Sequence, residues 1–181
     1  LPVQAGSSRI LAAMDRLYTR DDYLRRIEWL KTARRKYAIT TDIIVGFPGE
    51  TDEDFRQTLD LLDEVQYDSL FSFKYSPRPN TAALALPDRV PDDEKQRRLL
   101  AVQEKQRAIQ MRRNAEAIGS VQEVLVEGRN HAMGQWIGRT TDNRTLNFTH
   151  PASDGLAGQY LSVRVTRSGP NSLVGESITV V

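Results

Sequence analysis

Two polar residues near the start of the chain, Gln4 and Arg16, carry side chains that suit ligand binding. A guanidinium can pair through two hydrogen bonds with a carboxylate, and an amide can bond hydroxyl groups. The two residues are separated by twelve positions, and a short helix around Leu11 is expected between them. Arg16 could equally be a surface charge at the end of that helix, so the spacing alone leaves both interpretations open.

Gly46 and Phe47 directly follow the apolar run 43–45, which indicates a strand buried on both faces. Parallel α/β folds bind their ligands at the carboxyl ends of such strands. A residue without a side chain lets a flat ring approach the backbone there, although the same residues can form a simple strand-to-helix turn. Glu50 is expected either to contact a ligand or to compensate the charge of a helix N-terminus.

The next predicted strand, Ser69 to Tyr75, has two different faces because neighbouring side chains point to opposite sides. One face is aromatic and the other more polar: Phe71, Phe73 and Tyr75 against Leu70, Ser72, Lys74 and Ser76. We expect the aromatic face to pack under helices. The polar face would then line the interior, where Lys74 and Arg78 could meet phosphate or carboxylate. The alternative is a partly solvated edge strand with ordinary surface charges.

The elements that must position these residues alternate between helical and strand patterns over residues 1–91, as in βα units with a parallel sheet. Helices are expected from Ser7 or Ser8 to Met14, after Thr19, and after a capping box formed by Thr51 and Asp54. Strands are expected at 39–47 and 69–75. Pro77 and Pro79 end the second strand, since proline cannot donate to a ladder.

The rest of the chain reads as a linker, a long helix and a β-domain. Residues 81–91 form the linker, and residues 94–117 lack Gly and Pro, which predicts a helix from Asp92 or Asp93 to about Ile118. Five short β-rich segments then predict a small, closed or nearly closed barrel of the OB kind: 121–127, 134–140, 144–149, 159–166 and 172–180. The expected domains are therefore 1–91, 92–118 and 119–181.

The composition of the 181 residues, 39% apolar and 27% charged, is that of a water-soluble globular protein. No apolar run approaches the roughly 20 residues of a spanning helix, and the opening residues lack the layout of a secretory signal, so a cytoplasmic location is expected. The chain contains no cysteine and therefore no disulfide, thiolate zinc site or conventionally ligated iron–sulfur cluster. His131 and His150 are too far apart to suggest a metal site and are interpreted as loop residues.

Positive charge is concentrated in the predicted long helix, although the net charge of the chain is only +1. Seven basic residues there face one acid, Glu104: Lys95, Arg97, Arg98, Lys105, Arg107, Arg112 and Arg113. This basic stripe could follow an RNA backbone. It could also belong to a connector helix that packs Leu99, Val102 and Ile109 against the first domain, and both roles can hold on different faces.

Three segments of the first domain together resemble the later part of the radical S-adenosylmethionine (SAM) barrel of the methylthiotransferases: LPVQAGSSRILAAMDRLYTRDDY, TTDIIVGFPGETDEDF and FSFKYSPRPNTAA. The tail resembles the TRAM domain of that family, an RNA-binding β-barrel, through VLVEG at 124–128, GRTTDNRTLNF at 138–148 and SLVGE at 172–176. The implied fold is α/β: the C-terminal half of a radical SAM (βα) barrel, joined by a long helix to a small all-β, OB-like TRAM barrel.

Within that family, PVQ-GS and YSPRP are most similar to the branch that adds a methylthio group to C2 of N6-isopentenyladenosine beside the tRNA anticodon. The alternatives are the branches acting on ribosomal protein S12 or on threonylcarbamoyladenosine in tRNA, and a non-catalytic RNA-binding module. The resemblance implies SAM and two 4Fe-4S clusters as cofactors. One SAM methylates a sulfur, and another yields the radical that removes hydrogen from C2 of adenine.

The resemblance also implies site residues. Those expected to bind the cofactor are Gln4, Ser7, Arg16, Gly46, Phe47, Lys74 and Arg78. Those expected to contact RNA phosphates are Arg139, Arg144, Arg164 and Arg167, with Trp136 or Phe148 stacking on a base. Arg144, in a predicted turn, is the first choice of contact. Trp136 could instead be buried in the barrel core. No catalytic residue and no metal ligand is expected in this chain.

The chain departs from the family pattern at Ala5, usually serine, and at Asn80, usually glycine. The family's cysteine-bearing N-terminal domain and CxxxCxxC loop are missing, so we expect residues to precede Leu1 and the isolated chain to be inactive. A complete radical SAM barrel has about six βα units, of which residues 1–90 supply roughly three strands. At least one sheet edge therefore lacks a partner, and it is expected to pair with another copy, to be covered by the long helix or to be disordered.

Overall fold

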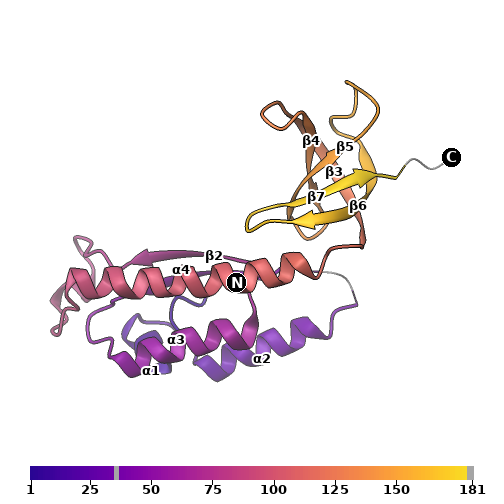
Figure 1. Ribbon diagram of the computed structural model, residues 1–181. Helices are drawn as coiled ribbons and strands as arrows, with labels where there is room; N and C mark the ends of the chain where they lie inside the picture. The colour runs from indigo at the N-terminus through magenta and orange to yellow at the C-terminus, as the bar shows by residue number, and fades with distance from the viewer. Residues whose placement is uncertain (35–36, 179–181) are drawn as a thin grey trace. The chain divides into compact units, whose positions relative to one another are not determined.

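The computed structural model describes residues 1–34 and 37–178 (Figure 1). The chain divides into two compact units, one made of residues 1–34 and 39–109 and the other of residues 35–38 and 110–181. The boundary between the units thus falls within a long helix, and the domain limits at 91 and 118 stay predictions. Among the described residues, no helix is both long enough and apolar enough to cross a membrane.

The first unit contains α1 (Ser8–Ala13), α2 (Arg20–Lys31), α3 (Asp52–Val65), the short 3-10 helix η1 (Ala82–Ala85) and most of α4 (Asp92–Ala115). Two of these helices, α2 and α3, begin with a capping box. The hydroxyls of Thr19 and Thr51 accept from the backbone N–H three residues on, and the aspartates there, Asp22 and Asp54, accept from the threonine N–H. These reciprocal bonds satisfy N–H groups that the helix leaves unpaired. Both predicted helix starts are confirmed.

The sheet of the first unit is parallel. Strand β1 (Thr40–Val45) pairs with β2 (Ser69–Lys74) in a register that runs from Thr40 opposite Ser69 to Val45 opposite Lys74. On the other edge of β1, Gln4 forms a parallel bridge: its N–H donates to the Asp42 carbonyl at 2.9 Å, and the Ile44 N–H donates to the Gln4 carbonyl at 2.8 Å. Of the roughly three strands expected in residues 1–90, two are present as strands and a third is only the bridge at Gln4, and the predicted parallel arrangement is confirmed.

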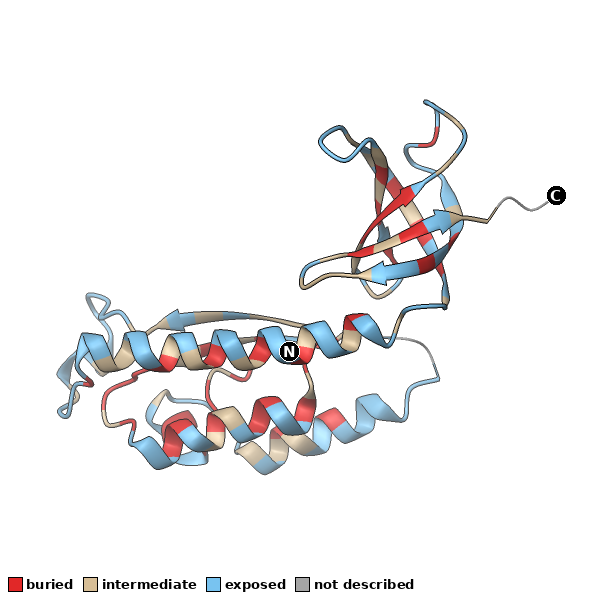
Figure 2. Ribbon diagram, in the orientation of Figure 1, coloured by how far each residue is buried: buried red, intermediate tan, exposed pale blue. Residues whose placement is uncertain are grey.

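The core of this unit lies on one side of the sheet. Ile43 and Val45 of β1 are buried there with residues of α2, α3 and α4, and Figure 2 shows buried positions along these helices. Val102 and Ile109 of α4 belong to this cluster and Leu99 packs against it, which confirms the predicted packing of α4.

The faces predicted for β2 are wrong. Leu70 packs against the helix-covered core, whereas Phe71 and Phe73 are 65% and 52% exposed. The aromatic side chains share the opposite face of the sheet with Asp42 and Ile44, their register partners on β1. The alternation of β2 was read correctly, but a single leucine, rather than the three aromatics, supplies the contact with the core.

The second unit is a closed barrel with the strand order β3-β4-β5-β7-β6. Its strands are β3 (Val121–Asn130), β4 (Gln135–Thr140), β5 (Thr145–Thr149), β6 (Tyr160–Ser168) and β7 (Leu173–Ser177). The predicted five-stranded barrel is confirmed, and the part of the last predicted strand beyond 178 lies outside the described residues. Gly138 and Gly175 allow the strands to approach closely, since a Cβ at either would lie within 2.4 Å of a neighbouring strand's carbonyl oxygen.

Candidate functional site

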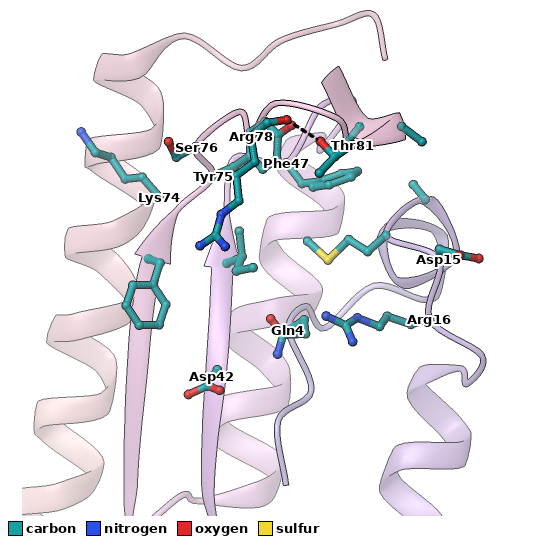
Figure 3. Close-up of a pocket in the computed structure, with 16 residues that line it drawn as sticks. Gln4, Asp15, Arg16, Asp42, Phe47, Lys74, Tyr75, Ser76, Arg78 and Thr81 are labelled. Atoms are coloured by element: carbon teal, nitrogen blue, oxygen red, sulfur yellow. Dashed lines mark hydrogen bonds between the residues drawn. The ribbon is translucent and has the colours of Figure 1, made fainter. Parts of the chain in front are cut away.

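A pocket of about 740 Å³ opens on the exposed face of the sheet in the first unit (Figure 3). This volume is in the range of small-ligand sites. The pocket brings together five of the residues predicted to bind a cofactor: Gln4, Arg16, Phe47, Lys74 and Arg78. The sequence alone had not indicated Asp42, Ile44 and Phe73, which line the same pocket from the middle of β1 and β2.

Arg16 is positioned by the end of α1. The chain leaves this helix with Asp15 in the left-handed conformation (φ 57°), and the N–H of Arg16 donates to the Leu11 carbonyl at 2.9 Å. This bond closes the helix and turns the next side chain. In Figure 3 the Arg16 guanidinium extends toward Gln4. Arg16 is thus an exposed residue at a helix end and also part of the pocket wall, so the two interpretations left open by the spacing hold together.

Charged side chains of the pocket are available to a ligand. Arg16, Arg78 and Asp42 make no hydrogen bond or ion pair through their side chains with any other described residue, and the guanidinium of Arg78 points into the pocket (Figure 3). The apolar part of the wall comes from Met14, Ile44 and other residues on the same elements. Two cationic groups beside an apolar surface suit a ligand that combines an anionic group with a flat ring.

Phe47 closes the pocket from the loop after β1. Its ring meets that of Tyr75 edge to face, with centroids 5.1 Å apart, and it is only 5% exposed. The Nζ of Lys95, a residue of α4, lies 5.8 Å from the centroid of the Tyr75 ring. Phe47 therefore presents a fixed apolar surface of the pocket rather than a mobile side chain.

Gly46 has a different role from the one predicted. It adopts φ +73°, a conformation that favours glycine, and a Cβ at this position would lie 2.3 Å from Cγ of Lys95. The space left by the missing side chain is filled by α4, and Gly46 does not line the pocket. Its N–H donates instead to the Glu50 carboxylate at 2.7 Å.

Glu50 is buried rather than exposed at the mouth of the site. Arg98 of α4 donates to its carboxylate at 2.7 Å and to its backbone carbonyl at 3.0 Å, and both side chains are at most 5% exposed. Burial raises the pKa of Glu50, and the bonds from Arg98 and Gly46 act against that rise. This buried pair fixes the turn that carries Phe47, so the predicted ligand contact of Glu50 is wrong. Its compensation of the charge at the N-terminus of α3 stays a prediction.

Ser7 and Lys74 also differ from expectation. Ser7 is 2% exposed and donates to Asp54 Oδ1 at 2.6 Å, away from the pocket. Burial alone would raise the pKa of Asp54, but hydrogen bonds from Arg9, Ser7 and Thr51 hold it well below its ordinary value. The Nζ of Lys74 points away from the pocket, toward Asp92 at 3.1 Å (Figure 3). Ser7 is thus a structural residue, and Lys74 borders the pocket without directing its charge into it.

Three residues of the basic stripe of α4 are paired within the first unit. Arg98 bonds Glu50 and Glu94, Arg97 also bonds Glu94, and Lys105 pairs with Asp63 of α3. Hydrogen bonds from Arg97 and Arg98 lower the pKa of Glu94 to about 2. The connector role is therefore the one that these contacts support.

In the second unit, the stacking role predicted for two residues is wrong. Trp136 and Phe148 are 3% and 0% exposed and belong to the barrel core. The Trp136 Nε1–H donates to the Ala152 carbonyl at 3.1 Å, so the polar atom of its ring is also satisfied inside the barrel. A barrel of this size needs large apolar side chains in its interior, and these two supply them.

The predicted phosphate contacts are partly occupied by other partners. Arg144 donates to the Arg113 carbonyl at 2.9 Å and pairs with Asp142 at 3.1 Å, which ties the end of α4 to a barrel turn. Arg164 donates to the Gly119 carbonyl at 3.3 Å, and Arg139 lies 3.4 Å from a Glu127 oxygen. Arg167 is exposed. Arg144, the first choice, is the least suited to a ligand.

The residues described do not form a metal site. No group of three or more His, Cys, Asp or Glu gathers within residues 1–34 and 37–178, and the full sequence has no cysteine. His131 and His150 lie in separate loops, as predicted. An iron–sulfur cluster therefore does not fit this chain's own residues.

Comparisons with known proteins agree with the two units. Residues 1–62 match the model of the Radical SAM superfamily, and residues 116–178 match that of the TRAM domain. Among curated proteins, the tRNA-2-methylthio-N(6)-dimethylallyladenosine synthase of Solibacter usitatus is 78% identical over 183 residues, covering 100% of this chain and 41% of the relative. The proteins of the same name from Koribacter versatilis and Aquifex aeolicus are 57% and 46% identical, covering 98% and 100% of this chain. The chain spans about two fifths of the length of these relatives.

Proposed function

We propose that the chain belongs to the radical SAM methylthiotransferases that carry a TRAM domain, and that it is part of an enzyme that adds a methylthio group to C2 of N6-isopentenyladenosine in tRNA. The relatives support this branch over those acting on ribosomal protein S12 or threonylcarbamoyladenosine, since the similar proteins carry the name of the isopentenyladenosine enzyme. The modified base would lie beside the anticodon, and the enzyme would work in the cytoplasm.

The observation that carries the proposal is the pocket on the open sheet face, in which Gln4, Arg16 and Arg78 converge beside an apolar wall. These residues suit SAM. A guanidinium would pair with the methionine carboxylate, Gln4 would bond the ribose hydroxyls, and Phe47 with Ile44 would flank the adenine. When bound, SAM would supply the methyl group and the radical precursor of the reaction. The residues of this chain bind and orient it and exclude water.

The iron–sulfur clusters that the family uses have no ligands here, because the chain contains no cysteine. We therefore assign cluster binding to other parts of the longer protein. The 181-residue chain alone is expected to purify without iron–sulfur absorption and to show no turnover. An absorption band of a cluster in the purified chain would contradict this assignment.

The pocket can be tested without turnover, by calorimetric titration of the 181-residue chain with SAM. Arg16→Ala removes one guanidinium from the pocket wall and is expected to weaken SAM binding about tenfold or more, the effect of losing a charge-assisted bond. Arg56→Ala is the matched control, because Arg56 is an exposed arginine of the same unit that pairs with Glu53 on α3. Equal affinities of the Arg16→Ala variant and the unchanged chain would exclude Arg16 from the site.

The barrel would hold the RNA. Its match to the TRAM domain and the tRNA named by the relatives support RNA as its partner. Self-association through the open edge of the β1–β2 sheet is a further expectation, since such an edge presents unpaired backbone groups. Light scattering of the chain would show a dimer if that edge pairs with a second copy and a monomer if it does not.

A further inference from the structure

A row of three side chains crosses the outer face of the barrel on neighbouring strands. Leu125 of β3 lies directly opposite Arg139 of β4 on one side and opposite Tyr160 of β6 on the other. Residues opposite one another on adjacent strands point to the same face, with their Cβ atoms about 5 Å apart. The register therefore places an apolar side chain between a guanidinium and a phenol ring.

The row lies in an open groove. Glu123, Leu125, Arg139, Thr140, Thr141 and Tyr160 line it. Tyr160 is 65% exposed, and its hydroxyl makes no hydrogen bond with any other described residue. An exposed aromatic ring beside a partly buried leucine offers an open stacking surface.

The charges of the groove favour a nucleobase over a phosphate. Arg139 is balanced by Glu127, which lies 3.4 Å away, and Glu123 adds a carboxylate to the groove wall. A phosphate group would meet this negative charge. A carboxylate is instead a good acceptor for the exocyclic amino group of a base, the contact by which Glu and Asp select cytosine.

We propose that this groove binds one unpaired nucleobase of an RNA strand, with Tyr160 stacked on the ring, Leu125 beneath it, and Glu123 accepting from an exocyclic amino group. In this proposal Tyr160 stacks on the base, whereas Trp136 and Phe148, which were predicted to do so, are buried in the barrel core. The proposal rests on the proposed RNA-binding function of the barrel and adds to it a specific surface and a preference for amino-bearing bases.

The test uses the complete 181-residue chain and labelled single-stranded oligo(C) and oligo(U), whose bases have the same size but differ in carrying an amino or a carbonyl group at C4. Fluorescence anisotropy measures both affinities. Tyr160→Ser is expected to weaken oligo(C) binding about tenfold, within the range for losing one base–aromatic stack. Tyr160→Phe keeps the ring and should stay within about twofold of the unchanged chain.

Two further variants sharpen the result. Glu123→Ala is expected to reduce the preference for oligo(C) over oligo(U) by about fivefold or more, since the acceptor for the amino group is gone. Trp29→Ala removes another exposed aromatic, 72% exposed on α2 of the first unit, and should leave both affinities unchanged.

The outcomes distinguish base binding in the groove from RNA binding by the barrel in general. If the unchanged chain binds oligo(C) and Tyr160→Ser binds it equally well, the groove is excluded while RNA binding by the barrel stands. If the unchanged chain binds neither oligonucleotide, RNA recognition by this barrel and the groove fail together. Equal binding of oligo(C) and oligo(U) by the unchanged chain would overturn the role of Glu123.

Discussion

The two units of the chain differ in where their charged side chains find partners. In the first unit, Arg98 and Glu50 are paired and buried on the helix-covered side, whereas Arg16, Arg78 and Asp42 stand without partners among the described residues on the open side. In the barrel, three surface arginines are already bonded to carbonyls or carboxylates: Arg139, Arg144 and Arg164. The guanidinium of Arg129 lies over the Trp136 ring, and Arg167 is exposed.

This difference follows from the sheets. The two-stranded sheet of the first unit has a core on one face only, so its other face can present uncommitted groups to a ligand. The barrel closes on itself and keeps its large apolar residues inside, which leaves outer-face side chains to pair across strands. We infer that the first unit recognises its ligand by charge, and the barrel by an exposed ring and an acceptor.

The largest expected effect tests whether the units are independent. Phe148→Ala leaves a cavity in the barrel core and should destabilise the barrel by about 3–5 kcal/mol. Trp136 reports on the barrel when Trp29, the other tryptophan, is replaced by Phe. In urea, the Trp136 fluorescence transition should move to lower concentration while the helical circular dichroism of the first unit does not. A joint shift of both signals would show that the units unfold as one.

A somewhat smaller effect is expected from the buried ion pair of the first unit. Arg98→Ala leaves the Glu50 carboxylate buried without its partner, which should cost about 3 kcal/mol. Adding Glu50→Gln should restore part of the loss, because the remaining group carries no charge. Urea unfolding followed by helical circular dichroism measures both changes, and Arg56→Ala, an exposed pair with Glu53, should shift the midpoint little. Failure of Glu50→Gln to recover stability would contradict a charge-based cause.

Asp54 should contribute to the pH dependence of the first unit's stability. Its pKa in the folded chain is held below the ordinary value, so its contribution to stability is present above about pH 4 and is lost as the pH falls below it. Glu50, whose pKa is raised, contributes with the opposite sign. Urea midpoints between pH 6 and pH 3 should therefore fall less for Asp54→Asn than for the unchanged chain. The Trp136 transition of the barrel serves as the internal control.

Sequence reasoning identified elements whose signals are local. The capping box at Thr51 and the strand β1 are marked by residues that lie within a few positions, and both elements were predicted correctly. The predicted burial of β1 on both faces is wrong, because Ile44 lines the open pocket. The five barrel segments were likewise marked by their own turns. Periodicity of this kind is fixed by covalent spacing and needs no tertiary information.

The predictions that failed depend on tertiary contacts between residues far apart in the sequence. Alternation showed that Phe71 and Phe73 share a face, but only tertiary packing decides that Leu70 faces the core. Trp136 and Tyr160 are both aromatic residues on strands, and the register alone determines which is buried and which is exposed. Gly46 was predicted to let a flat ring approach the backbone, yet the atom that its missing side chain admits, Cγ of Lys95, belongs to a helix far along the chain.

The smallest expected effect concerns the salt dependence of RNA binding. The affinity for a single strand falls by about 0.7 logarithmic units per tenfold increase in salt concentration for each phosphate neutralised. Because Arg139 is the groove's own cation and already neighbours Glu127, a shallow slope is expected for the unchanged chain, and Arg139→Ala should lower it by less than about one unit. Anisotropy titrations with oligo(C) at several salt concentrations measure the slope, and Arg56→Ala is again the control. A steep slope that Arg139→Ala leaves intact would mean that free positive charge elsewhere on the chain holds the RNA, and the contrast between a charge-reading first unit and a base-reading barrel would then be lost.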